Sequence, residues 1–186
     1  MKLYSLCILG FLVLISCTKQ TKINKQFNCK STYHSSALEE ITDVKKEYTV
    51  TFPKNWKTNL YYDAIQSSIY GADTTKQLSK TTILDVSLIH QKINFDAQFQ
   101  LLLEKENLAK NLITINTKII DFKNKKAFFS VSIGKKNNLK LKLLDLFIKV
   151  DENRFLHSKT TIYGDSLIDQ RICNTIDLIE KINIQQ

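Results

Sequence analysis

The segment YTVTFPKNWK, residues 48–57, decides the fold of this chain. Tyr48, Val50 and Phe52 alternate with threonines, which is the period of a strand that turns one face toward a core. Pro53 has no N–H group to pair and ends the strand, and Trp56 then folds back over the edge of the sheet. The chain therefore builds a β-sheet around this segment.

Further strand patterns follow along the chain. They predict strands over residues 58–62, 65–72, 82–90, 113–122, 128–133, 139–150 and 154–163, separated by turn-forming residues. Within 139–150 the alternation changes phase at Leu143–Leu144, which indicates either a β-bulge or a second half buried on both faces. Because the strands follow one another through short turns, we expect a mostly antiparallel sheet.

Three helices are expected beside the sheet. The first covers residues 36–43, where Ser36 and Glu39 form a capping box. The second begins at Asn94 or Asp96, and the third begins at Ser166, with Asp169 three residues later. Each later helix has an apolar stripe: Phe99, Leu102, Leu103 and Leu108 in the second, and Ile168, Ile172, Ile176, Ile179 and Ile182 in the third. Helices packed on an antiparallel sheet define an α+β fold.

The strand with its Phe52-Pro53-x-x-Trp56 motif, the hairpins and the two later helices together resemble the PsbP-like superfamily over residues 47–184. The resemblance implies an α/β/α sandwich, in which an antiparallel sheet lies between helices. It also implies a domain used for protein association, and it brings no catalytic residue or cofactor.

The first 17 residues resemble the signal peptide of a bacterial lipoprotein. Lys2 precedes an apolar run, and Leu14-Ile15-Ser16-Cys17 resembles the lipobox, which implies cleavage after Ser16 and acyl chains on Cys17. A membrane-spanning helix needs roughly 20 apolar residues, more than this run offers. An ordinary secretory signal favours a small residue where Leu14 stands. We therefore predict a signal peptide over 1–16, a lipidated cysteine with a flexible basic tether over 17–35, and a single α+β domain over 36–186.

The formal net charge of +9 becomes +8 once Lys2 is removed. A basic balance can indicate nucleic-acid binding, but the lysines are scattered and no RNP, zinc-finger or helix-turn-helix pattern occurs. We expect attachment to a membrane through the lipid on Cys17 and no nucleic-acid partner. Thr18 and Lys19 follow the lipidated cysteine, without the aspartate that would favour the inner membrane. The predicted location is therefore the cell envelope, at the periplasmic face of the outer membrane.

Two cysteines, Cys29 and Cys173, remain in the exported domain. In an oxidising compartment two thiols at opposite ends of a domain predict a disulfide, here across 144 residues. Two free thiols, or a metal or redox pair, are the alternatives, although no C-x-x-C spacing supports a redox site.

The sequence contains no recognisable catalytic motif. His34, His90 and His157 are isolated, and neither H-E-x-x-H, G-x-S-x-G nor a P-loop occurs. Asp63, Asp73 and Asp85 are too widely spaced for a calcium loop. We therefore expect a protein that is not an enzyme and has no metal or cofactor.

Two functional hypotheses follow from these observations. In the first, the protein is a membrane-tethered accessory module that binds a protein partner through its exposed aromatic residues, Trp56, Tyr61, Tyr62 and Tyr70. In the second, it is a periplasmic carrier for a small apolar ligand, with a cavity lined by Phe128, Phe129, Leu146 and Phe147.

Overall fold

The computed structural model of the chain describes residues 22–29 and 37–185, so Cys17 and the lipobox lie outside the described residues. The elements in chain order are α1 (Lys22–Gln26), β1 (Leu38–Thr42), β2 (Tyr48–Pro53), β3 (Lys57–Tyr62), β4 (Gln66–Ala72), the 3₁₀ turn η1 (Leu78–Lys80), β5 (Thr82–Ile89), α2 (Ala97–Ala109), β6 (Leu112–Phe122), β7 (Lys125–Lys136), β8 (Leu139–Lys149), β9 (Phe155–Tyr163), α3 (Ile168–Glu180) and β10 (Asn183–Ile184).

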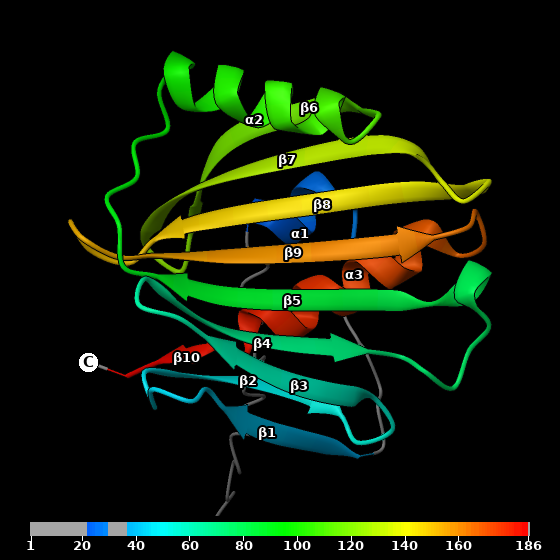
Figure 1. Cartoon of the computed structure of the whole chain (residues 1–186), viewed down its shortest axis with the longest axis horizontal. Helices are drawn as coiled ribbons and strands as arrows, with labels where there is room; N and C mark the ends of the chain where they lie inside the picture. Colours follow the sequence, from blue (N-terminus) through cyan, green and yellow to red (C-terminus); the bar gives the residue numbers. More distant parts are fainter. Residues whose placement is uncertain (1–21, 30–36, 186) are drawn as a thin grey trace, which may run out of the picture.

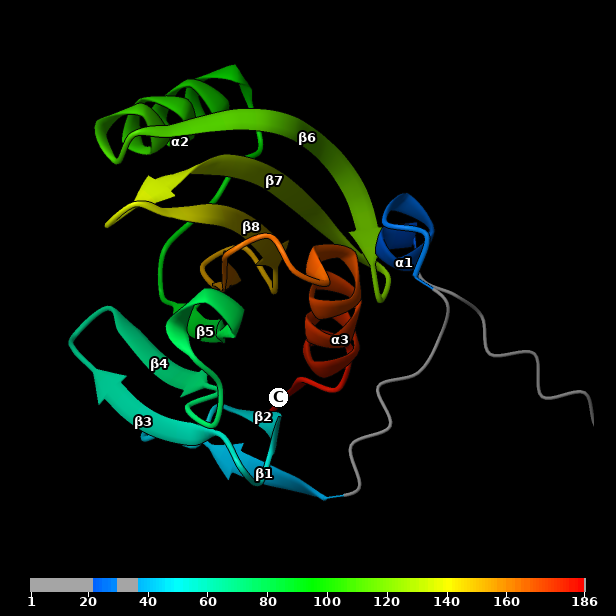
Figure 2. The same cartoon turned by 90° about the vertical axis from the view of Figure 1, so that its right-hand side faces the viewer.

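A seven-stranded sheet forms the centre of the molecule, in the order β3-β4-β5-β9-β8-β7-β6, and every pair in it is antiparallel. The sheet curves around α3, which lies on its concave face, while α2 lies on its convex face (Figure 2). A small sheet, β1-β2-β10, lies below them (Figure 1). The predicted α+β fold with helices on both sides of an antiparallel sheet is confirmed.

The main core fills the space between α3 and the concave face. Phe129, Leu146 and Ile69 of the sheet are fully buried there, together with Ile172 and Ile176 of α3. The predicted isoleucine stripe of α3 is therefore the face that packs on the sheet. Burying a side chain of this size stabilises the fold by about 1.5–3 kcal/mol.

A second core lies under α2 on the convex face. Phe99 contacts Phe128 and Phe147 with ring centroids 5.3 and 5.1 Å apart. Asp96 caps the helix by accepting a hydrogen bond from the N–H of Phe99, as expected from the sequence. The predicted stripe is only partly right, because Leu102 and Leu108 are 57% and 58% exposed. The inward face follows a spacing of four residues instead: Phe99, Leu103 and Asn107.

The strands β7 and β8 pair without interruption from Ala127↔Ile148 to Lys136↔Leu139. The phase change at Leu143–Leu144 is therefore not a β-bulge. The second half of β8 is buried on both faces, which was the other interpretation of the sequence. This happens because α3 and α2 cover opposite faces of the strand. The register shift lies in β6, between Thr114 and Asn116.

The helix predicted over residues 36–43 is wrong, because residues 38–42 form strand β1. Leu38 pairs with Pro53 and Ile41 with Val50, so β2 supplies the partner that converts this segment into a strand. Leu38 and Ile41 also pack against the main core. A tertiary partner thus outweighs the weak local preference of a capping box.

The flexible tether predicted over 17–35 does not hold for residues 22–29, which pack on the domain. Ile23 of α1 is fully buried, and Phe27 lies against Phe129 with ring centroids 5.6 Å apart. Asn24 donates a hydrogen bond to Glu180 at 2.7 Å. The predicted disulfide is present: Cys29 Sγ and Cys173 Sγ are 2.06 Å apart and fasten this segment to α3.

Gly71 on β4 lies directly against the buried ring of Phe52 on β2, and a Cβ at this position would overlap that ring. We expect Gly71→Ala to lower the free energy of unfolding by about 1–3 kcal/mol, because the ring must leave its packed position. Urea denaturation measures the loss. Adding Phe52→Leu to Gly71→Ala should recover part of it, and strictly additive losses would contradict the overlap.

Candidate functional site

The structure separates the four aromatic residues predicted to contact a partner. Tyr61 on β3 pairs with Ser68, and Tyr70 on β4 pairs with Asn59, so the two tyrosines are diagonal neighbours on the convex face. Tyr62 is 66% exposed and points to the concave side, next to the edge of the sheet. Trp56 is half-buried against Phe52, with ring centroids 5.9 Å apart, and lines a pocket.

Tyr61 and Tyr70 belong to a larger open face on β4, β5 and β9. Within the described residues no helix covers these strands on the convex side (Figure 1). Strand pairing aligns Tyr70 with Asp85 and Lys159 in one row across the sheet, next to a row that contains Ser68, Ser87 and His157. We call this surface, with Tyr61, Tyr70, Asp85, His157 and Lys159 as its main side chains, the open face.

Strand β3 forms the outer edge of the seven-stranded sheet beside the open face. The hydrogen bond from Asp63 N to Gln66 O begins the ladder between β3 and β4. In an antiparallel pair every second residue bonds to the partner strand, so the backbone N–H and C=O groups of Thr58, Leu60 and Tyr62 point away from β4. In the described part of the chain, β4 is the one strand that pairs with β3. Leu60 is 43% and Tyr61 58% exposed, so the edge displays apolar side chains on both faces.

The histidine of the open face is held in place by its neighbours. His157 Nε2 lies 2.8 Å from Asp145 Oδ1, and its ring stacks on Phe147 with centroids 4.2 Å apart. Ser87 faces His157 across β5 and β9, but its Oγ hydrogen bonds to Ser68 Oγ at 2.8 Å. Asp145, His157 and Ser87 are thus neighbours, but the serine–histidine hydrogen bond that would activate Ser87 as a nucleophile is not formed.

Asp85 lies among these residues with its Oδ1 buried and unpartnered in the described part of the chain. Burial raises the pKa of Asp85 above its ordinary 3.8, while His157, Lys159 and a hydrogen bond from Ser87 lower it less. Folded protein therefore holds the Asp85 proton to a higher pH than unfolded protein does.

Between pH 3.8 and the raised pKa of Asp85, the free energy of unfolding should fall as pH rises, since the folded state binds more protons there. We expect Asp85→Asn to remove this decline, so that its stability relative to the wild type increases with pH. Urea denaturation at a series of pH values from about 3.5, just below the ordinary carboxyl pKa, to about 7 tests this. Lys159→Gln should extend the decline to higher pH, and an unchanged profile in both variants would contradict the assignment.

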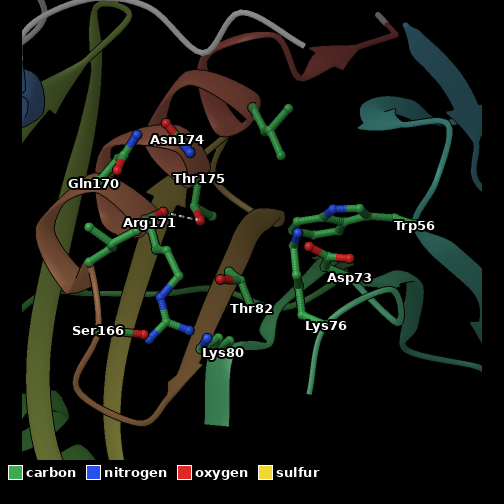
Figure 3. Close-up of a pocket in the computed structure, with 12 residues that line it drawn as sticks. Trp56, Asp73, Lys76, Lys80, Thr82, Ser166, Gln170, Arg171, Asn174 and Thr175 are labelled. Atoms are coloured by element: carbon green, nitrogen blue, oxygen red, sulfur yellow. Dashed lines mark hydrogen bonds between the residues drawn. The ribbon is translucent and has the colours of Figure 1, made fainter. Parts of the chain in front are cut away.

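The pocket at Trp56 is the second feature of interest. It has a volume of about 440 Å³ and lies between the first half of α3 and the segment that joins β4 to β5 (Figure 3). Lys76 and Lys80 line it from that segment, and Arg171 lines it from α3. Asp73 is the one carboxylate among the lining residues, and its Oδ1 accepts hydrogen bonds from Thr75.

Arg171 is fixed in the wall of this pocket by two carbonyl groups. Its Nη1 donates to Thr81 O at 3.1 Å and its Nη2 to Tyr163 O at 2.8 Å. Its Nε is buried and has no hydrogen-bond partner within the described ranges. Burial lowers the pKa of Arg171, but a guanidinium stays charged at any physiological pH. The pocket therefore contains a positive charge that no carboxylate neutralises among residues 22–29 and 37–185.

The first turn of α3 closes one side of the pocket. Ser166, Leu167 and Gln170 line it, and the capping box predicted from Ser166 and Asp169 does not form. Leu167 occupies the N-cap position with φ of 53°, and its side chain has no group that can accept a hydrogen bond. A helix start without a capping side chain keeps its partial positive charge available to solvent or to a ligand.

The four residues proposed to line a carrier cavity do not share one. Phe129 and Leu146 face the concave side, while Phe128 and Phe147 face the convex side and pack under α2. Neighbouring residues of a strand point to opposite faces, so these four cannot line a common cavity. Each is at most 6% exposed.

Comparisons with known proteins extend this description at the level of the fold. No protein-family model and no curated protein sequence matches the chain. The solution structure of cyanobacterial PsbP (CyanoP) from Synechocystis sp. PCC 6803 is similar at a TM-score of 0.61 and 13% identity, covering 84% of this chain and 99% of that one. The Ran-binding protein Mog1p of Saccharomyces cerevisiae is similar at a TM-score of 0.55 and 7% identity, covering 80% and 95%. The chain has a PsbP-like fold.

The sequence did not predict most residues of the open face or of the pocket at Trp56. Lys76, Lys80 and Arg171 meet only through tertiary packing, and so do Asp85, Asp145 and His157. In the described part of the chain, no three His, Cys, Asp or Glu side chains are arranged to hold a metal ion. No helix there has the length and apolar character needed to cross a bilayer.

Proposed function

We propose that this protein is a lipid-anchored accessory module of the cell envelope that binds a protein partner without catalysis, and that the partner adds a strand to β3. The observation that carries the proposal is the outer edge of β3, with which no described strand other than β4 pairs. Its outward backbone groups are available for pairing, and Leu60, Tyr61 and Tyr62 are exposed on its two faces. Strand addition takes affinity from backbone hydrogen bonds and specificity from alternate side chains.

Of the four aromatic residues predicted to contact a partner, the three tyrosines belong to the proposed β3 site and Trp56 does not. A strand added to β3 would contact Tyr61 and Tyr70 on the convex face, and Leu60 and Tyr62 on the concave face. Trp56 lies in its own pocket and belongs to a different site. The fold supports a protein partner, since a structure of the same fold is named as a Ran-binding protein.

The anchor determines how the module would stand on the membrane. In this proposal the chain is cut after Ser16 and acylated at Cys17, and attachment is to the periplasmic face of the outer membrane. Five residue steps separate Cys17 from Lys22, the start of α1, and they reach at most roughly 18 Å. Because α1 contacts β6, the edge of the sheet opposite β3, the lipid would hold the β6 side near the bilayer and leave β3 accessible.

Crosslinking and co-purification from membranes test the proposal, with the intact mass measured in parallel. Wild-type protein should begin at an acylated Cys17 and capture one stoichiometric partner. The Cys17→Ala variant should no longer be attached to the membrane. Leu60→Lys should reduce capture at least about tenfold, since an edge lysine opposes strand pairing. Leu102→Lys, the same change on the exposed side of α2, is the matched control and should capture normally.

Two results would overturn parts of this proposal separately. A mass that includes Met1 would exclude the lipid anchor. Equal capture by Leu60→Lys and wild type, with both proteins folded by circular dichroism, would exclude β3 as the docking strand.

A further inference from the structure

The pocket at Trp56 is lined by three cationic side chains and one carboxylate, that of Asp73, so positive charge is in excess there. Lys76, Lys80 and Arg171 line it, and none of the three forms an ion pair within the described ranges. Figure 3 shows Arg171 and Lys80 pointing toward one end of the pocket, with Lys76 beside Trp56 at the other. Clustered cations along a concave wall attract and concentrate anions.

The pocket also offers groups that would fix the orientation of an anion. Arg171 is held by the carbonyls of Thr81 and Tyr163, so its position does not depend on a ligand. The first turn of α3 faces the same space, and its N-cap residue Leu167 provides no acceptor. A fixed guanidinium next to the N-terminus of a helix is a favourable arrangement for a phosphate or carboxylate group.

Trp56 adds a flat apolar wall. Its ring is packed on Phe52, which holds it in place, while its other side lines the pocket. A volume of about 440 Å³ is within the range of pockets that bind small organic molecules. An indole ring favours stacking against a planar group of similar size.

We infer that this pocket binds a small organic anion, a carboxylate or phosphate monoester carried on a flat apolar group, with the charge toward Arg171 and Lys80 and the flat part against Trp56. This site is separate from the edge of β3 and does not depend on the proposed partner.

Intrinsic fluorescence tests the inference directly, because Trp56 is the single tryptophan of the chain. Titration with phenyl phosphate should give a saturable change in emission, and phenylacetate a similar one. Benzyl alcohol, which lacks the charge, should give none in the same range, and inorganic phosphate should compete with phenyl phosphate only weakly. Raising the salt concentration should weaken binding, because the attraction is electrostatic.

Exposed lysines provide variants that leave the fold intact. Lys76→Gln and Lys80→Gln should each raise the Kd for phenyl phosphate about 5- to 10-fold, and the double variant further, because each removes one charge-assisted contact. Lys54→Gln removes an exposed lysine two residues from Trp56 that does not line the pocket, and its Kd should equal that of the wild type.

Three outcomes would overturn the inference. The first is no saturable response to phenyl phosphate or phenylacetate up to about 10 mM, a concentration that detects even very weak binding. The second is an equal response to benzyl alcohol. The third is a Lys54→Gln effect as large as those of Lys76→Gln and Lys80→Gln.

Discussion

Replacing Cys29 and Cys173 together by serine is expected to lower the free energy of unfolding by up to about 5 kcal/mol, the value that loop-closure entropy gives for a crosslink of this span. The disulfide joins residues separated by 144 positions and fastens the α1 segment to α3. Without it, the unfolded chain regains the conformations that the crosslink excludes. The urea midpoint of the double variant, compared with oxidised wild type, measures the loss.

Reduction supplies the control for this prediction. Dithiothreitol should lower the midpoint of the wild type to that of the double variant and leave the variant unchanged. Alkylation of the folded wild type without reductant should label neither cysteine. An unchanged wild-type midpoint after full reduction would show that the crosslink contributes nothing measurable.

The substitution Asp43→Ala should lower the free energy of unfolding by about 3–4 kcal/mol, because several buried hydrogen-bond donors lose their acceptor at once. Asp43 is 2% exposed, its Oδ1 accepts from the N–H groups of Glu47 and Tyr48, and its Oδ2 accepts from Lys45 N and from Ser67 Oγ. Ser67 belongs to β4, so Asp43 links the small sheet to the seven-stranded sheet. Its removal should loosen the joint beside the β3 edge.

The loss should also depend on pH. Burial alone raises the pKa of Asp43, but the hydrogen bonds from Ser67, Tyr48, Glu47 and Lys45 outweigh it and hold the pKa below 3.8. The stabilisation is therefore complete above pH 3.8 and is lost as pH falls through the lowered pKa. Urea denaturation at neutral and acid pH should show the wild type approaching Asp43→Ala only at the acid end.

An exposed aspartate with similar bonds is the matched control for Asp43. Asp63 Oδ1 accepts from Ile65 N and Gln66 N, but at an exposed turn where water replaces the lost acceptor. The substitution Asp63→Ala should lower the free energy of unfolding by no more than about 1 kcal/mol. Equal losses for the two alanine variants would contradict the role of burial.

The sequence alone determined the secondary structure wherever the local pattern was strong. The alternating residues of β2, β5 and β7, the isoleucine stripe of α3 and the Asp96 cap all follow from short-range spacing, and the structure confirms them. The same holds for the antiparallel pairing of consecutive strands joined by short turns, whereas the pairing of β5 with β9, which are distant in the chain, was not predicted. The pairing of Cys29 with Cys173 followed from counting the cysteines that remain in a domain expected to be exported.

The tertiary structure alone decided which segments acquired partners and which surfaces stayed uncovered. Residues 38–42 became a strand because β2 offered an edge, and residues 22–29 packed on the domain because Ile23 found a buried position. The free edge of β3 exists because no other described strand pairs with it. The cationic pocket brings residues 56, 76, 80 and 171 together from distant parts of the chain. Local spacing encodes the periodicity of a single element, whereas burial and the proximity of charges depend on contacts between elements that no short pattern contains.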